Sequence, residues 1–190
     1  MSVALRKLMT VEEFLDWENQ QELKHEFDGF GPVAMTGVTQ EHSLIQINLT
    51  SALHARLRGG PCRVVGSDLK VSVAGRIRYP DAFVFCNPLP HGTRVVAEPV
   101  VVFEILSPST AETDHDDKNR EYRDTSSILR YVILEQNRQG VTVFTRTGGD
   151  WVGRLADGDA VLSMPEIGVE LPLSEIYDGI TFPDPASVLP

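Results

Sequence analysis

The chain has 190 residues, of which 42% are hydrophobic and 23% charged, with 15 Gly and 12 Pro. This composition predicts one compact globular domain over residues 1–190 and excludes collagen-like, coiled-coil and disordered chains. Subtracting 27 Asp and Glu from 17 Lys and Arg leaves a net charge of −10, opposite in sign to the surface of a dedicated nucleic-acid binder. Residues 131–190 are the most acidic, with 3 basic and 9 acidic residues, whereas residues 61–130 have 9 and 10.

Two cysteines, Cys62 and Cys86, are too few and too widely spaced to form a disulfide framework or a thiolate zinc site. They fit a reducing cytoplasm, which is where we expect the protein to act. No signal-peptide core is recognisable, and no apolar run approaches the roughly 18 residues needed to cross a membrane. We therefore expect no membrane role.

The first third of the sequence predicts a helix, a hairpin and a long helix, in that order. Thr10 and Glu13 fit a capping box at the start of the first helix. Asp28-Gly29 begins a turn between two short apolar stretches, which predicts a hairpin. From residue 41 to residue 57 the apolar side chains recur mostly at helical spacing, and a Gly-Gly-Pro run ends the pattern.

The rest of the sequence predicts a mixed sheet. Strand-like patterns occupy residues 64–65, 69–73, 82–86, 131–134, 141–144 and 151–155. The apolar run at residues 100–106 predicts a central strand that is buried on both faces. The polar segment 113–124 and residues 173–177 are expected to be helical. This order of elements predicts an α/β or α+β domain built around a mixed sheet.

Glu104 interrupts the apolar strand at residues 100–106. A carboxylate there is costly unless it is paired, protonated or bound to a metal, and an ion pair with an arginine explains it about as well as a functional site does. Asp81 follows Pro80 and opens the strand at residues 82–86, so its side chain can project toward a neighbouring strand. Two converging carboxylates are ligands that Mg²⁺ or Mn²⁺ prefers, and such a metal positions water and stabilises a transferring phosphate.

Other polar residues offer weaker signals. Lys118 and Tyr122 share one side of a predicted helix with Asp114. A solvated ion pair between Asp114 and Lys118 explains that spacing as well, and is the simpler interpretation by itself. Asp68 and Lys70 share a strand face, where Lys70 either contacts a phosphate or belongs to an exposed strand pair. The 5 histidines lack close ligand spacing, and no Gly-rich phosphate loop, GxSxG elbow or dinucleotide fingerprint occurs.

The run Glu104-Ile105-Leu106-Ser107-Pro108-Ser109-Thr110 carries the most specific family resemblance in the sequence. Further matching stretches are residues 9–14, 24–27, 66–71, 79–81, 171–173 and 176–177. With these stretches the chain resembles, from Met9 to about Gly179, the Uma-two family of bacterial restriction-endonuclease-like proteins, a branch of the PD-(D/E)XK nuclease superfamily. The resemblance implies a three-layer fold, with a central mixed β-sheet flanked by helices, and magnesium-assisted hydrolysis of phosphodiester bonds.

The resemblance also implies a set of metal ligands. Asp81 and Glu104 would hold the metal, and the Ile105 carbonyl would supply a further oxygen. The superfamily has a lysine two residues after the glutamate, but this chain has Leu106 there. The family resembles this sequence in having an apolar residue at that place, with a lysine supplied by the next helix. Lys118 fits that role.

Three further matches are less direct. Glu26 matches the glutamate that precedes the family's Asp-Gly turn, although here that turn comes one residue early. Tyr122 lies on the same helix side as Lys118 and joins the predicted catalytic residues. His42 matches a family histidine that opens the long helix, and placement at a helix N-terminus is the simpler explanation for it. The basic residues expected to contact phosphates are Lys70, Arg76 and Arg78.

These residues predict an endonuclease that uses Mg²⁺ or Mn²⁺ to hydrolyse DNA. The acidic composition predicts weak, metal-dependent DNA binding, and the family analogy suggests a homodimer. An alternative is a catalytically retired nuclease-fold module that binds nucleic acid or a protein partner without cleavage, which Leu106 and the acidic surface favour. A third interpretation is a phosphodiesterase whose substrate is not DNA.

Overall fold

The computed structural model describes residues 8–106 and 114–182, which form β-sheets packed against helices. The elements in chain order are α1 (Val11–Glu18), β1 (His25–Phe27), β2 (Pro32–Ala34), α2 (Gln40–Leu57), β3 (Arg63–Gly66), β4 (Lys70–Val73), β5 (Arg76–Arg78), β6 (Ala82–Phe85), β7 (Val95–Val96), β8 (Val101–Ile105), α3 (Asp114–Asp124), β9 (Arg130–Leu134), β10 (Gly140–Thr147), β11 (Asp150–Asp157), β12 (Val161–Met164), the 3₁₀-helix η1 (Pro165–Ile167), β13 (Val169–Pro172) and α4 (Leu173–Ile176). In these two ranges, none of the helices combines the length and apolar character that crossing a bilayer requires.

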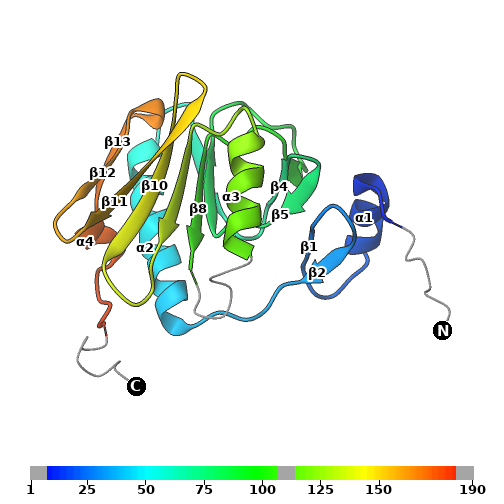
Figure 1. Ribbon diagram of the computed structural model, residues 1–190, viewed down its shortest axis with the longest axis horizontal. Helices are drawn as coiled ribbons and strands as arrows, with labels where there is room; N and C mark the ends of the chain where they lie inside the picture. The colour runs from blue at the N-terminus through cyan, green and yellow to red at the C-terminus, as the bar shows by residue number, and fades with distance from the viewer. Residues whose placement is uncertain (1–7, 107–113, 183–190) are drawn as a thin grey trace.

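A six-stranded mixed sheet forms the centre of the molecule (Figure 1). Its strand order is β11-β10-β9-β8-β6-β3, and β8 pairs in parallel with β9 while the other neighbours pair antiparallel. All five residues of β8 are buried. The prediction of a central strand within residues 100–106 is therefore confirmed.

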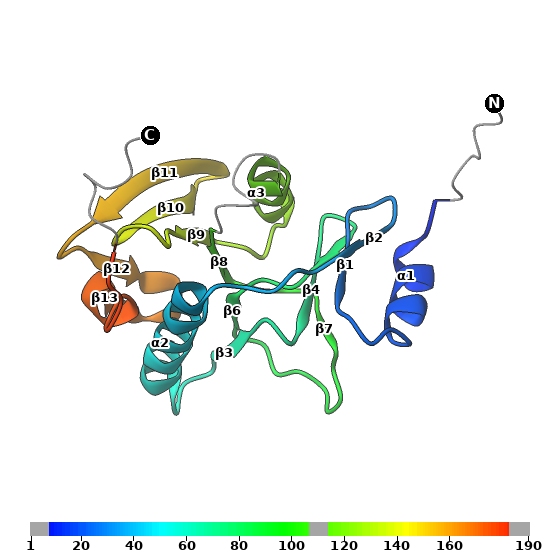
Figure 2. The ribbon, with the colours of Figure 1, turned by 90° about the horizontal axis from the view of Figure 1, so that it is seen from below.

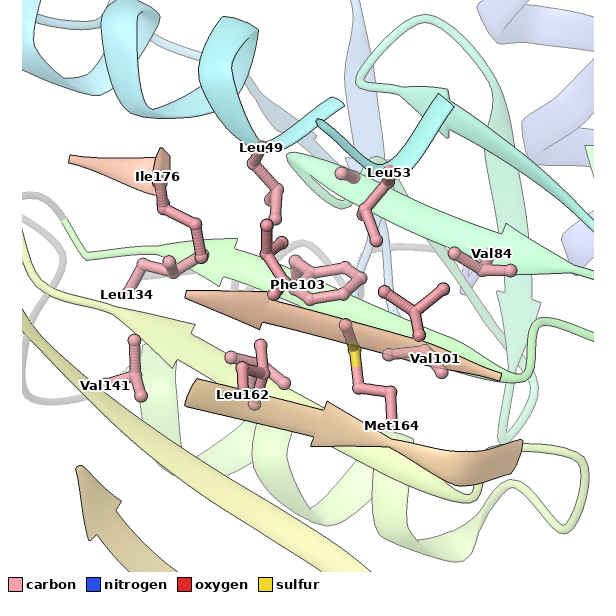
Figure 3. Packing of buried hydrophobic residues seen from close by; sticks show 14 of the residues in the cluster. Leu49, Leu53, Val84, Val101, Phe103, Leu134, Val141, Leu162, Met164 and Ile176 are labelled. Carbon is pink, nitrogen blue, oxygen red and sulfur yellow. The ribbon is translucent and has the colours of Figure 1, made fainter. Parts of the chain in front are cut away.

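Two helices cover opposite faces of this sheet, α2 on one side and α3 on the other (Figure 2). Alternation along β8 divides its side chains between the two layers. Phe103 points toward α2 and packs in one apolar cluster with Leu49 and Leu53 (Figure 3), whereas Val102 packs in a second cluster with Tyr122 of α3. The predicted α+β fold, with helices flanking a central mixed sheet, is confirmed.

A second mixed sheet, in the order β2-β1-β5-β4-β7, lies beside the first at the N-terminal end of the chain (Figure 1). Helix α1 packs on it through Phe14, which meets Phe27 and Ile77 in a third apolar cluster. The predicted capping box is confirmed, because the Thr10 and Glu13 side chains each accept a hydrogen bond from the other residue's backbone N–H. This sheet brings residues of β1 and β5 toward α3.

Strands β5, β7, β12 and β13 were not predicted. Each has only two to four residues, which is too short for an alternating pattern to stand out. In β5 the sequence Arg-Ile-Arg also hides its burial, because two of its three side chains are charged. These strands can be identified only from their hydrogen bonds to neighbouring strands in the folded chain.

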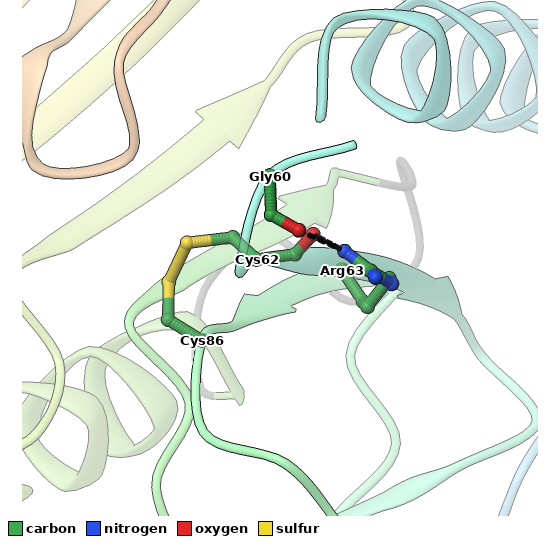
Figure 4. Close-up of a disulfide and its surroundings, with 4 residues drawn as sticks. All are labelled: Gly60, Cys62, Arg63 and Cys86. Atoms are coloured by element: carbon green, nitrogen blue, oxygen red, sulfur yellow. Dashed lines mark hydrogen bonds between the residues drawn. A yellow bond between two sulfur atoms is a disulfide. The ribbon is translucent and has the colours of Figure 1, made fainter. Parts of the chain in front are cut away.

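Cys62 and Cys86 form a disulfide (Figure 4). The two residues are 24 positions apart, and we expected no disulfide framework from them. In the antiparallel pair β3–β6, Arg63 is the register partner of Phe85, so the adjacent residues Cys62 and Cys86 lie opposite each other. Strand pairing therefore joins two cysteines that the sequence places far apart.

Candidate active site

Asp81 and Glu104 lie together at one end of the β6–β8 pair. Ala82 of β6 is the register partner of Phe103 of β8, which places the preceding Asp81 opposite Glu104 in an antiparallel ladder. The backbone N–H of Ile105 donates to Asp81 Oδ2 at 2.7 Å. The structure therefore brings together the two carboxylates that the sequence predicts as metal ligands.

Glu104 is buried on the face of β8 that meets α3. The Tyr122 hydroxyl donates to Glu104 Oε1 at 2.5 Å, and Lys118 Nζ lies 3.6 Å from the same oxygen. Burial raises the pKa of Glu104 to about 8; the Lys118 charge opposes this, and the charges of Asp81 and Glu26 add to it. Burial is therefore the main reason that Glu104 holds its proton to a higher pH than an exposed carboxyl does.

Lys118 lies between two carboxylates. Its Nζ is 3.3 Å from Glu26 Oε1 as well as 3.6 Å from Glu104 Oε1. Because Lys118 and Tyr122 are four residues apart on α3, both side chains reach Glu104 from the same side of the helix. The side chain of Asp114, the third residue predicted on that side, lies outside the described part of the structure.

The Glu26 carboxylate is fixed by hydrogen bonds from the last residue of β5 and from the residue after β5. Its Oε1 accepts from the Tyr79 backbone N–H at 3.0 Å, and its Oε2 accepts from Arg78 Nη1 at 3.1 Å. Arg78 also donates twice to Glu121, each time at 2.7 Å. Burial disfavours the Arg78 charge, but the bonds to Glu121 and the charge of Glu26 outweigh it and raise the pKa of Arg78.

The three basic residues predicted to contact DNA all have carboxylate partners. Lys70 is 5% exposed and its Nζ lies 2.5 Å from Glu18, while Arg78 is 3% exposed in the pairs just described. Arg76 is more accessible, but its Nε donates to the Asp28 carbonyl at 2.9 Å and lies 2.9 Å from Glu121. A phosphate can reach Lys70 or Arg78 only if these ion pairs open, so their role as DNA contacts stays a prediction.

His42 belongs to the site, although the sequence indicated only a helix N-terminus for it. It is buried in the first turn of α2, and its Nε2 lies 2.9 Å from Asp81 Oδ1. One turn later, Gln46 donates to the Asp81 backbone carbonyl at 2.7 Å. The i,i+4 spacing of these two polar residues at the start of an otherwise apolar helix face is a signal that both face the sheet, although it does not name Asp81 as their partner.

The donor set suits a magnesium-type ion. Within the described ranges, no group of three or more His, Cys, Asp or Glu is arranged to hold a metal, but Mg²⁺ commonly uses one or two carboxylates and keeps several waters. Asp81 and Glu104 provide two carboxylates, and the Ile105 carbonyl provides one further oxygen of the kind that Mg²⁺ prefers. Leu106 stands where the superfamily has its lysine, and its side chain packs against an apolar cluster. Residues 107–110, the rest of the run that resembles the family, lie outside the described structure.

A family model and two relatives match most of this chain. The model of the Uma2 (Uma-two) family, whose description is "Putative restriction endonuclease", matches residues 11–174. Two uncharacterized proteins of Synechocystis sp. are relatives: one is 30% identical over 178 residues, covering 92% of this chain and 94% of its own, and the other is 26% identical over 153 residues, covering 78% and 86%.

A solved structure shares the fold. It is the crystal structure of "a putative nuclease belonging to DUF820" from Anabaena variabilis. It aligns with a TM-score of 0.74 at 18% sequence identity and covers 89% of this chain and 97% of that one. At this identity the likeness establishes the fold alone.

Proposed function

The chain belongs to the Uma2 family, and from that premise we propose that it is an endonuclease that uses Mg²⁺ or Mn²⁺ to hydrolyse the phosphodiester bonds of DNA. The observation that carries the proposal is the pairing of Asp81 with Glu104 across β6 and β8, next to the ammonium group of Lys118. Paired carboxylates with a nearby cation supply the groups that phosphodiester hydrolysis needs.

The metal ligands in this proposal are Asp81, Glu104 and the Ile105 carbonyl. A bound divalent metal activates water and offsets charge on the phosphate. The chain contributes by fixing both carboxylates: the Ile105 N–H and His42 hold Asp81, and Tyr122 holds Glu104. Ligands held in this way need little reorganisation when the metal binds.

Lys118 is the proposed catalytic lysine, and its ammonium orients the attacking water or meets charge on the phosphate. Glu26 and Glu104 hold this ammonium at 3.3 and 3.6 Å. Lys118→Met should lower the cleavage rate by roughly 10²- to 10⁴-fold, the usual contribution of a positioned acid–base group. The control is Lys24→Met, which removes the same charge from an exposed pair with Asp68. A Lys118→Met rate equal to that of the control would contradict the assignment.

Loss of either metal ligand should have a larger effect. Asp81→Asn and Glu104→Gln should each reduce cleavage of duplex DNA to background and weaken Mn²⁺ binding measured by calorimetry, because a neutral amide is a poor ligand for a hard cation. Asp68→Asn, which removes an exposed carboxylate, is the matched control, and circular dichroism checks folding. If both site variants still cut DNA in Mg²⁺ at the wild-type rate, the mechanism is wrong.

A retired nuclease-fold module is the second candidate, and the apolar packing of Leu106 favours it. Such a module would bind nucleic acid or a protein partner without cleavage. Calorimetric titration with Mn²⁺ separates the two candidates, since a working carboxylate site binds the ion and a retired one does not. A wild-type chain that binds Mn²⁺ but cuts only other phosphodiesters would support the third interpretation, a phosphodiesterase with another substrate.

We extend the proposal to organisation and compartment. Residues 1–190 form one nuclease-like domain, and a homodimer would let two sites address both strands; sedimentation equilibrium tests the dimer. The cytoplasmic expectation requires that Cys62 and Cys86 be reduced in the cell, because thiol pools there reduce most disulfides. Alkylation of the two thiols in fresh lysate, read by mass spectrometry, tests it.

A further inference from the structure

A polar hollow of about 630 Å³ lies between the C-terminal half of α3 and the turn that joins β10 to β11. It is lined by Asn119, Arg120, Arg123, Asp124, Arg146, Gly149 and Trp151. Three arginines face one aspartate here, in a chain whose net charge is −10. The hollow, called the arginine pocket below, therefore presents local positive charge on an acidic protein.

One wall of the arginine pocket is held rigidly. Arg146 donates to three backbone carbonyls at the end of α3 and beyond it, those of Arg123 at 2.8 Å, Thr125 at 3.0 Å and Ile128 at 2.9 Å. Its guanidinium carbon lies 4.7 Å from the centre of the Trp151 ring, and Trp151 Nε1 donates to the Arg123 carbonyl at 3.2 Å. These bonds cap the helix and fix both side chains, which lowers the entropy lost when a ligand binds.

Helix capping does not account for Arg120 and Arg123. Both side chains are exposed on α3. Arg120 lies 3.6 Å from Asp117, but the two side chains are 73% and 66% exposed, and such a pair contributes little to stability. Exposed guanidinium groups beside a rigid wall are well suited to bind phosphate, because they present several donors in a planar array.

The arginine pocket is close to the candidate active site along α3. From Lys118 to Arg123 the helix rises five residues, or about 7.5 Å. One DNA strand carries a phosphate about every 3.4 Å of its axis. This rise corresponds to about two phosphate spacings, and five residues also turn the helix by about 140°. A strand that passes around α3 from a reacting phosphate at Lys118 therefore has its second phosphate along at the level of Arg123.

We propose that the arginine pocket binds the phosphodiester backbone of the DNA strand beside the position that is cut. Arg120 and Arg123 contact a phosphate, and the Trp151–Arg146 wall packs against the adjoining sugar. The inference rests on the proposed function and says where an acidic nuclease holds its substrate. The arginine pocket offers exposed cations for this contact. Lys70 and Arg78 do not, because both are buried in ion pairs.

Fluorescence anisotropy with a labelled oligonucleotide tests the pocket, using the full chain with Ca²⁺ in place of Mg²⁺ over a series of salt concentrations. The variant is the double substitution Arg120→Gln/Arg123→Gln. Its control, Arg58→Gln/Arg154→Gln, removes the same charge from two arginines exposed elsewhere. The pocket variant should bind about tenfold more weakly at low salt, and the slope of log K against log[salt] should fall by about 1 to 2 relative to the control.

Tryptophan emission provides a second measurement, made at the wall of the pocket itself. The chain has two tryptophans, so Trp17→Phe leaves Trp151 as the reporter. Saturating oligonucleotide should change the Trp151 emission, and the change should vanish when Arg120→Gln/Arg123→Gln is added. Equal affinity and equal slope for the pocket and control variants, or unchanged emission at saturation, would overturn the inference.

Cleavage assays on the same preparations separate this inference from the proposed function. If the wild-type chain cuts DNA while the pocket variant binds and cuts like the control, the inference fails and the proposed function stands. If oligonucleotide binds through the arginines but no metal supports cleavage, the pocket stands and the nuclease proposal fails.

Discussion

The two faces of β8 bury different kinds of side chain. Phe103 and Glu104 are adjacent in sequence and both buried, at 0% and 9% exposure. Phe103 packs among apolar side chains below α2, whereas Glu104 meets Lys118 and Tyr122 of α3. Two side chains that are similarly buried therefore have different roles: Phe103 packs the core, and Glu104 belongs to the proposed site.

Strand alternation makes this division possible, because successive side chains point to opposite layers. The α2 layer gains stability from apolar area removed from water. The α3 layer holds a carboxylate whose burial is unfavourable without partners. Changes on the two faces should then have separable effects on stability and on metal binding.

The largest effect on stability is expected on the apolar face. Phe103→Ala should lower the free energy of unfolding by about 3–5 kcal/mol, since it opens a cavity in a packed core. Urea unfolding measures the change, and Val152→Ala, at an exposed position of β11, should cost less than about 0.5 kcal/mol. Wild-type Mn²⁺ affinity should persist in folded Phe103→Ala. A large loss of Mn²⁺ affinity would show that the faces are coupled.

On the other face, the pH dependence of stability should report Glu104. Its pKa is about 8 in the folded protein against an ordinary value of 4.5, so between these values the folded state keeps a proton that the unfolded chain has released. The protonated Glu104 side chain contributes its full stability below about pH 4.5, and this contribution is lost as the pH rises through 8. Over that range the free energy of unfolding should fall by up to about 1.4 kcal/mol for each pH unit.

Glu104→Gln removes this titration. In EDTA, the variant should gain stability relative to wild type as the pH rises from 5 toward 8, and Mn²⁺ should reverse the difference by favouring the wild-type carboxylate. Paired urea titrations at each pH cancel the contribution of the histidines. A difference that does not change with pH would mean that Glu104 is ionised throughout.

The smallest effect is expected from Tyr122→Phe. It removes one hydroxyl that donates to Glu104 at 2.5 Å, and a hydrogen bond to a protonated carboxyl contributes about 0.5–1.5 kcal/mol. Because that bond lowers the pKa of Glu104, its loss should extend the pH-dependent decline to higher pH. Thermal unfolding at several pH values measures both effects. A variant indistinguishable from wild type at every pH would show that the hydroxyl does not support the site.

Long, strongly patterned elements could be predicted from sequence, and short ones could not. Helix α2 and strand β8 were predicted because each shows a regular apolar pattern over its length. Strands β5, β7, β12 and β13 were missed, since a few residues contain too little periodicity and their stability comes from neighbours far away in sequence.

The candidate site divides in the same way. Asp81 and Glu104 could be named in advance because a carboxylate in or beside an apolar strand is conspicuous in the sequence itself. Helical spacing put Lys118 and Tyr122 on one side of α3. The contact of His42 with Asp81, by contrast, joins residues 39 positions apart, and no local pattern gives the direction of the histidine ring.

Local patterns are enough to predict where the polar groups of the site occur and which side of each element they share, because alternation and helical periodicity are properties of the backbone. Which charges are buried together depends instead on how distant elements pack. From the sequence, Lys70 and Arg78 look available to bind phosphate. In the folded chain they form buried ion pairs, Lys70 with Glu18 and Arg78 with Glu26 and Glu121. Arg120, Arg123 and Arg146 meet around Trp151 because β10 and β11 fold back against α3, and partner choice across such distances depends on the whole fold.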